Sequence, residues 1–202
     1  MVLYVARHGE TDYNAQGRYA GSTDVPINQK GVCQAQELAE RLTGMTFDAV
    51  ISSPMLRARQ TADIVCSVLD MQYTVYEEFA ERDMGIYEGM IREEANKRHH
   101  NLHFSRLHAI NPDEAPEGGE SLRQVCDRIN HGMRRLYRDY GGQNILLICH
   151  GFSARAVHRY CHDLSFDEMP GEVLKNCEYV SYNWNEGTDL VFRTGAYSKA
   201  YT

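Results

Sequence analysis

Residues 2–9 read Val2-Leu3-Tyr4-Val5-Ala6-Arg7-His8-Gly9. The apolar run predicts a short buried strand that stops at a cation, an imidazole and a glycine. In α/β folds, ligands bind in the crevice beyond the carboxyl ends of parallel strands. We therefore expect Arg7 and His8 to lie where a ligand binds. Arginine offers a planar, permanently charged fork for phosphate, and a neutral imidazole can act as a nucleophile.

Strand and helix patterns alternate along most of the chain. Apolar runs at 49–52, 73–76 and 144–149 predict further strands, and apolar residues recur at helical spacing over 32–42, 58–69 and 122–136. A hairpin over 179–194 would add an antiparallel edge. The pattern predicts an α/β fold, a three-layer αβα sandwich with a mostly parallel central sheet, an antiparallel edge and a lid-like insertion over the strand ends.

One segment interrupts this alternation. Residues 82–119 are polar, rich in His and Arg, and end in Pro116-Glu117-Gly118-Gly119. No linker, repeat or low-complexity tract divides the 202 residues, a length typical of one domain. We expect a single domain over 1–202, in which 82–119 forms a lid that shapes substrate specificity.

Composition limits the classes of partner. Lys and Arg number 21 against 28 Asp and Glu, and this net charge of −7 argues against nonspecific binding to nucleic acid or to an anionic membrane. The six cysteines form no Cys-x-x-Cys pair, which favours free thiols in a reducing compartment. No apolar run is long enough for a bilayer, and the apolar start is too short for a signal-peptide core. We expect a cytoplasmic monomer or homodimer that acts on a small molecule.

Four segments carry candidate chemistry, and each follows a predicted strand: 7–9, 52–61, 81–89 and 150–151. Together they supply two histidines, two arginines and a glutamate at strand ends. This set would suit phosphoryl transfer through a phosphohistidine, because arginines and a second imidazole can hold the charge on the phosphoryl oxygens.

In this order, the segments resemble the histidine phosphatase (phosphoglycerate mutase-like) superfamily. The resemblance is carried by Arg7-His8-Gly9, by the pattern Ser-Ser-Pro-x-x-Arg-Ala-x-Gln-Thr-Ala at 52–62 and by His150-Gly151. It therefore covers most of the chain, and it implies the following roles. The catalytic residues would be His8, Glu81, Arg7, Arg57 and His150, and the residues that bind phosphate or substrate would be Asn14, Arg18, Gly21 and Gly151.

The resemblance makes His8 the nucleophile and Glu81 the proton donor to the leaving oxygen, and later the base that activates water. Arg7, Arg57 and His150 would hold the phosphoryl group. The flanking arginines favour the neutral imidazole that a nucleophile needs. No metal or cofactor is expected, because guanidinium groups supply the countercharge.

Among the family's activities, the compact chain and the segment 81–89 resemble the phosphatase branch. The expected function is metal-independent hydrolysis of a small phosphomonoester, such as a sugar phosphate, a phosphoglycerate-like ester or α-ribazole phosphate. Phosphoglycerate mutase-type transfer is the alternative, followed by a non-catalytic module that binds phosphate or phosphoproteins.

A different nucleophile is also encoded in the chain. Cys149 and Arg155 satisfy the Cys-x5-Arg spacing of cysteine-dependent phosphatases, in which a thiolate attacks phosphorus. Against this hypothesis, the intervening residues are poor in glycine. Cys149 also ends an apolar strand, where thiols are commonly inert.

Overall fold

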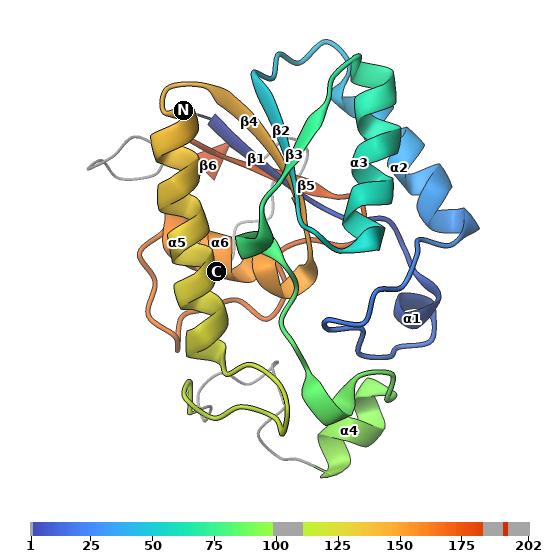
Figure 1. Cartoon of the computed structure of the whole chain (residues 1–202), viewed down its shortest axis with the longest axis vertical. Helices are drawn as coiled ribbons and strands as arrows, with labels where there is room; N and C mark the ends of the chain where they lie inside the picture. The colour runs from blue at the N-terminus through green and yellow to red at the C-terminus, as the bar shows by residue number, and fades with distance from the viewer. Residues whose placement is uncertain (1, 99–110, 184–191, 194–202) are drawn as a thin grey trace.

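The computed structural model describes residues 2–98, 111–183 and 192–193. Its centre is a six-stranded sheet in the order β3-β2-β4-β1-β5-β6 (Figure 1). The strands are β1 (Val2–Arg7), β2 (Ala49–Ser52), β3 (Tyr73–Val75), β4 (Asn144–Cys149), β5 (Tyr179–Asn183) and β6 (Phe192–Arg193). The first four are parallel, whereas β5 pairs antiparallel with β1, and β6 with β5. The predicted mostly parallel sheet with an antiparallel edge is confirmed.

Helices cover both faces of the sheet (Figure 1). One face carries α2 (Gln29–Leu42) and α3 (Leu56–Leu69), and the other carries α5 (Leu122–Tyr140) and α6 (Gly151–Cys161). Shorter helices lie in the connections: α1 (Asp12–Ala15), η1 (Glu77–Phe79), η2 (Gly85–Tyr87) and α4 (Arg92–Arg98). Of the described helices, none is long and apolar enough to cross a membrane.

Strand β4 is a continuous apolar run because it lies in the middle of the sheet, with helices on both faces. Because side chains alternate along a strand, Ile145, Leu147 and Cys149 pack against α5 and α6, whereas Leu146 and Ile148 pack against α2 and α3. All five are fully buried. A strand covered on both faces needs apolar residues at every position, as the sequence shows.

The pairing of β1 with β4 places their polar ends side by side. Arg7 is in register with Cys149, and the backbone N–H of His8 donates to the carbonyl of Cys149 at 3.0 Å. On the other side of β4, the N–H of Ser53 donates to the carbonyl of Ile148 at 3.0 Å. The carboxyl ends of β1, β4 and β2 therefore lie side by side at the same end of the sheet.

The expected lid is described in two parts, 82–98 and 111–119, and its middle, 99–110, lies outside the described residues. The first part contains η2 and α4. There, Met84, Tyr87 and Ala95 form a small apolar cluster of their own. The long helix after the segment starts as predicted, because Ser121 caps α5 in a reciprocal capping box with Gln124.

Candidate active site

A cavity of about 470 Å³ opens where the strand ends meet. Eight of the nine residues named from the sequence line it: Arg7, His8, Asn14, Arg18, Gly21, Arg57, Glu81 and Gly151. The ninth, His150, is fully buried, and its ring centroid lies 5.1 Å from that of His8. The structure thus brings together all the residues that the sequence analysis selected.

His8 is held as a neutral imidazole with a defined tautomer. Its side chain is buried, and Nδ1 lies 2.7 Å from the carbonyl oxygen of Gly9. A carbonyl oxygen only accepts hydrogen bonds, so Nδ1 carries the proton and Nε2 keeps its lone pair. Burial, and then repulsion from Arg57 and Arg7, hold the pKa of His8 well below its ordinary value, although the hydrogen bond to Gly9 opposes this. The ring therefore keeps an unprotonated Nε2 at neutral pH.

Two buried guanidinium groups lie beside this ring. Arg7 donates through Nη1 to the carbonyl of Leu174 at 3.0 Å and lies 3.7 Å from a carboxylate oxygen of Glu172. Arg57, in the first turn of α3, donates to the carbonyls of Thr23 at 2.9 Å and Gly21 at 2.8 Å. The Nε of each arginine is buried without a hydrogen-bond partner among the described residues. Because a buried donor without an acceptor is costly, the two Nε groups indicate that an anionic ligand binds here.

His150 is fully buried and lies within hydrogen-bond distance of a serine. Its Nε2 lies 2.6 Å from the hydroxyl oxygen of Ser53, whereas its buried Nδ1 has no hydrogen-bond partner in the described part of the chain. Burial, and then the charges of Arg57, His8 and Arg7, hold the pKa of His150 well below its ordinary value. His150 is therefore also a neutral ring.

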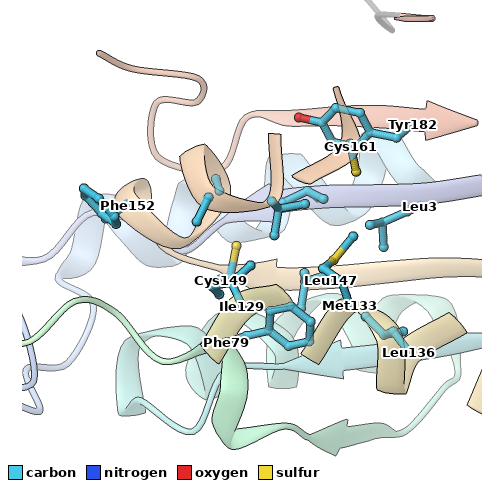
Figure 2. Close-up of a cluster of buried hydrophobic side chains, with 14 of the residues drawn as sticks. Leu3, Phe79, Ile129, Met133, Leu136, Leu147, Cys149, Phe152, Cys161 and Tyr182 are labelled. Carbon is cyan, nitrogen blue, oxygen red and sulfur yellow. The ribbon is translucent and has the colours of Figure 1, made fainter. Parts of the chain in front are cut away.

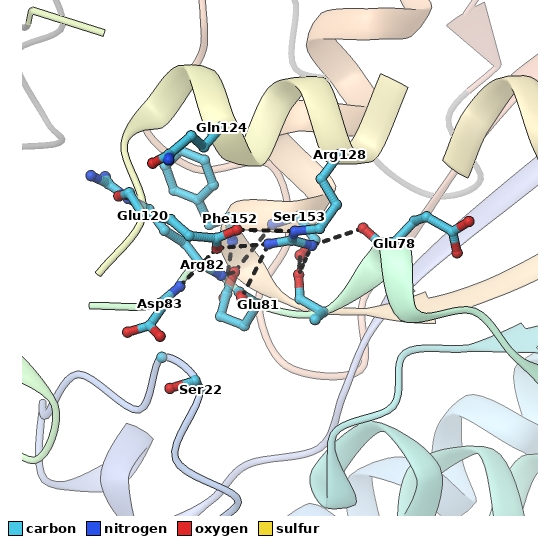
Figure 3. Close-up of polar contacts among 12 residues, drawn as sticks. Ser22, Glu78, Glu81, Arg82, Asp83, Glu120, Gln124, Arg128, Phe152 and Ser153 are labelled. Carbon is cyan, nitrogen blue, oxygen red and sulfur yellow. Dashed lines mark hydrogen bonds and ion pairs between the residues drawn. The ribbon is translucent and has the colours of Figure 1, made fainter. Parts of the chain in front are cut away.

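Glu81 is anchored at the beginning of α6 (Figure 3). Its carboxylate accepts from the backbone N–H groups of Phe152 at 3.2 Å and Ser153 at 3.3 Å, in the first turn of the helix. The segment before it is fixed by Arg128 of α5, which donates to the carbonyls of Glu78 at 2.8 Å and Ala80 at 3.0 Å. Helices α5 and α6 thus hold the carboxylate in the cavity wall.

The Asn-x-x-x-Arg stretch contributes one amide and one cation. Asn14 Oδ1 accepts from the N–H of Thr11 at 3.2 Å and from Nδ2 of Asn176 at 3.2 Å. With its oxygen bound twice, Asn14 has its NH₂ group left for a ligand. Arg18 donates through Nη1 to the carbonyl of Gly89 at 2.7 Å, which ties the stretch to the segment 81–89.

The two predicted glycines differ in how strictly the fold requires them. Gly21 has φ +53°, and a Cβ there would lie 2.1 Å from a carboxylate oxygen of Glu88, so both backbone and space require glycine. At Gly151, a Cβ would meet the guanidinium carbon of Arg7 at 3.4 Å, an ordinary contact. The fold itself therefore tolerates a Cβ at position 151, and only a bound ligand would exclude one there.

The structure adds residues that the sequence analysis did not assign to the histidine site, although Arg155 was named there for the cysteine-dependent alternative. Arg82, Arg92, Arg155, Tyr19, Asn96, Phe152 and Glu172 also line the cavity. Arg155 lies four residues after Gly151 on α6, and that helical spacing was a usable signal. Asn176 and Glu172 lie in the loop before β5, where no periodicity or motif marks them.

The structure places Cys149 away from the cavity. Its thiol lies in the core on the α5 and α6 side of the sheet, with Phe79 and Ile129 (Figure 2). Burial raises the pKa of the thiol, which disfavours the nucleophilic thiolate. The cysteine-dependent alternative is therefore wrong, because β4 alternation turns Cys149 into the core. Across the described residues, no group of three or more His, Cys, Asp or Glu is placed to hold a metal ion.

Known proteins are similar to this chain in sequence and in fold. The histidine phosphatase superfamily (branch 1) matches residues 3–194. An uncharacterized phosphatase PhoE of Bacillus subtilis is 30% identical over 190 residues, covering 91% of each chain. Phosphoglycerate mutase-like protein 4 of Arabidopsis thaliana is 31% identical over 158 residues, covering 77% of this chain and 69% of the relative.

A solved structure of a mycobacterial glucosyl-3-phosphoglycerate phosphatase in complex with VO3 has the same fold. It superposes with a TM-score of 0.85 at 22% identity, covering 96% of this chain and 97% of the other. The two named activities indicate a phosphatase or a mutase. Because the family matches nearly the whole chain, the chain belongs to the histidine phosphatase superfamily (branch 1).

Proposed function

We propose that the protein is a phosphomonoester hydrolase that works through a phosphohistidine formed on Nε2 of His8. The observation that carries the proposal is the neutral His8 ring between two buried arginines, each with an unmatched Nε donor among the described residues. A phosphoryl dianion would supply the missing acceptors. The NH₂ group of Asn14 and a proton on Nδ1 of His150 would complete its ligands.

The reaction would proceed in two displacements. First, the His8 Nε2 lone pair forms a bond to phosphorus while the bond to the leaving oxygen breaks, and Glu81 donates a proton to that oxygen. Second, Glu81 takes a proton from water, whose oxygen attacks phosphorus as the phosphorus–nitrogen bond breaks. Inorganic phosphate leaves, and His8 and Glu81 are restored. The hydrogen bond from His8 Nδ1 to Gly9 orients the ring throughout.

The substrate class is a small phosphorylated metabolite. A cavity of about 470 Å³ has the size of a small-molecule site. Sugar phosphates, phosphoglycerate-like esters and α-ribazole phosphate all belong to this class. The proposed chemistry needs no metal, because Arg7 and Arg57 supply the countercharge.

Mutase activity is the second candidate, favoured by the similarity to phosphoglycerate mutase-like protein 4. A mutase would return the phosphoryl group to a sugar-acid hydroxyl instead of to water. Hydrolysis is preferred because the phosphatase relative covers 91% of the chain, against 77% for the mutase-like relative.

The test is release of inorganic phosphate from p-nitrophenyl phosphate in the presence of a chelator. We expect turnover by the wild type and none by His8→Ala, with an acid-labile phosphoenzyme in the wild type alone. His131→Ala, an exposed histidine on α5, is the matched control. Full turnover by His8→Ala would contradict the mechanism. Interconversion of 2- and 3-phosphoglycerate after a bisphosphate primer, without net release, would favour the mutase.

A further inference from the structure

Ser53 and His150 are neighbours because of the strand register. Ser53 directly follows β2 and His150 directly follows β4, and Ser52 lies opposite Ile148 in the parallel pair of these strands. The backbone N–H of Ser53 donates to the carbonyl of Ile148 at 3.0 Å. Ser53 and His150 are both 0% exposed. The sheet therefore holds a serine hydroxyl against the second histidine of the site, where solvent does not reach.

The Ser53 hydroxyl has one proton and one acceptor for it. Its oxygen accepts from the backbone N–H of Met55 at 3.3 Å and lies 2.6 Å from Nε2 of His150. A backbone N–H only donates, so the N–H of Met55 cannot take the hydroxyl proton. Across the described residues, the Ser53 hydroxyl makes no hydrogen bond other than these two. Nε2 of His150 is therefore the acceptor that remains for it.

The two neutral tautomers of His150 differ in how many buried groups they leave without a partner. With the proton on Nε2, the ring donates to Ser53, and both the hydroxyl proton and the Nδ1 lone pair are unmatched, because no described residue bonds Nδ1. With the proton on Nδ1, the hydroxyl donates to Nε2, and only the Nδ1–H group is unmatched. Because each unmatched buried group is costly, the proton belongs on Nδ1.

This proton position leaves complementary atoms on the two histidine rings, whose centroids are 5.1 Å apart. On His8, the Nδ1–H group is bonded to Gly9 and the Nε2 lone pair is left. On His150, the Nε2 lone pair is bonded to Ser53 and the Nδ1–H group is left. Phosphoryl transfer needs a lone pair that attacks phosphorus and donors that hold the phosphoryl oxygens. One ring therefore supplies the lone pair and the other supplies a donor.

We propose that Ser53 is a positioning residue that sets the tautomer of His150, so that His150 offers an N–H donor to the phosphoryl group. This inference rests on the proposed phosphoryl site at His8. Which histidine nitrogen carries the proton is set by the hydrogen bond that the other nitrogen makes. Without the Ser53 hydroxyl, nothing holds the proton on Nδ1, and a lone pair there would repel a phosphoryl oxygen instead of binding it.

The tautomer can be read by ¹⁵N NMR of protein with labelled histidines, because protonated and unprotonated ring nitrogens have well-separated chemical shifts. The chain has nine histidines, and comparison with His150→Gln identifies the His150 signals. At neutral pH we expect the proton on Nδ1 in the wild type and a population with the proton on Nε2 in Ser53→Ala. Ser52→Ala is the matched control, because Ser52 is equally buried but donates to the carbonyl of Ser53 at 2.9 Å. It should keep the wild-type tautomer.

The same variants show whether the tautomer matters for the anion. In Ser53→Ala, we expect inhibition by inorganic phosphate to weaken about tenfold or more, the worth of one hydrogen bond to a charged group. The kcat/KM for p-nitrophenyl phosphate should fall by a similar factor. Ser53→Thr keeps the hydroxyl and should restore both the tautomer and the inhibition. Ser53→Cys, a weaker donor of similar size, should restore part of them if the buried position does not tolerate the threonine methyl group.

The outcomes separate this inference from the proposed function. A proton on Nε2 of His150 in the wild type, or an unchanged tautomer in Ser53→Ala, would overturn the inference and leave the hydrolase standing. A changed tautomer with unchanged inhibition by phosphate would also overturn it. If the wild type hydrolyses no ester, the proposed function fails, and NMR with calorimetric binding of inorganic phosphate decides the role of Ser53. A proton that leaves Nδ1 in Ser53→Ala, together with weaker phosphate binding, would support that role.

Discussion

Asn176 orients Asn14. Its Nδ2 donates to Asn14 Oδ1 at 3.2 Å and to the carbonyl of His8 at 2.9 Å. A loop residue far along the chain therefore contacts both the backbone of His8 and the side-chain amide of Asn14. Because Thr11 donates to the same oxygen, the Asn14 NH₂ group is the part left for a phosphoryl oxygen. The orientation of Asn14 therefore depends on a residue that does not line the cavity.

Asn176→Leu should lower kcat/KM for p-nitrophenyl phosphate about tenfold, the worth of about one hydrogen bond. The variant keeps a similar volume but cannot donate, so Asn14 can rotate its amide. Inhibition by inorganic phosphate should weaken in parallel, and the midpoint of thermal unfolding is measured alongside. Unchanged kinetics would show that Asn14 needs no support from Asn176.

Glu81→Gln should affect alkyl and aryl phosphates differently. General acid catalysis contributes about 10²- to 10⁴-fold when the leaving group is poor, and much less when the leaving group is already acidic. We expect kcat for glycerol 3-phosphate to fall within that range and kcat for p-nitrophenyl phosphate to fall far less. Glu78→Gln, just upstream and paired with Arg135, is the control. Equal slowing of both esters would remove Glu81 from the role of acid.

Glu88→Gln should loosen the loop that holds Arg57. The Glu88 carboxylate accepts from the N–H groups of Ser22 at 2.6 Å and Thr23 at 2.8 Å, and from both their hydroxyls. Burial alone would raise its pKa, but these bonds hold the pKa of Glu88 below its ordinary value. The same loop offers Arg57 the carbonyls of Gly21 and Thr23.

An amide has one acceptor oxygen, so a glutamine cannot accept hydrogen bonds from both Ser22 and Thr23 as the two carboxylate oxygens do. We expect KM for p-nitrophenyl phosphate to rise about tenfold, as expected for a loss of roughly 1.4 kcal/mol in binding, with a smaller change in kcat. Glu94→Gln, exposed on α4, should change neither constant. A loss of kcat at constant KM would contradict the positioning role.

His158 should make the fold sensitive to acid. Burial, and then His162, lower its pKa to about 4, whereas an unfolded histidine titrates near ~6.5. Protons therefore bind the unfolded chain more readily, and stability should fall as the pH drops from about 6.5 to about 4. Above that window, His158 has no influence on the pH dependence.

His158→Gln should flatten this slope by about 1 kcal/mol per pH unit at most, because solvent screens a partly buried ring. Urea unfolding at several pH values measures it, with His131→Gln on the surface of α5 as the control. His8 and His150, whose pKa values are also lowered, should leave a residual slope. An unaltered slope in His158→Gln would contradict the assignment.

The site residues that directly follow a predicted strand could be predicted from the sequence. An apolar run followed by Arg7 and His8, and a second run followed by His150, place these residues together once parallel pairing is assumed, and the register of β1 with β4 confirms this. The helical spacing over 58–69 also locates α3, which begins two residues earlier, at Leu56. In the expected hairpin over 179–194, residues 184–191 lie outside the described residues.

The rest of the site depends on tertiary packing. Asn176 reaches His8 across 168 residues, and no periodic pattern encodes such a contact. Arg82 follows Glu81 directly, yet only the ring of Phe152 on another helix shows that it shares a wall with Arg155. Sequence patterns predict helices and strands, whereas these contacts depend on how the loops are positioned in the folded protein.

The burial of Cys149 beneath the site has a practical consequence. Of the six free cysteines, Cys33 is exposed and the other five are buried. An alkylating reagent should label Cys33 at once and Cys149 only when β4 separates from α5 and α6. Mass spectrometry of the labelled protein would then measure how fast the structure opens next to His150, and no reporter group would have to be engineered into the chain.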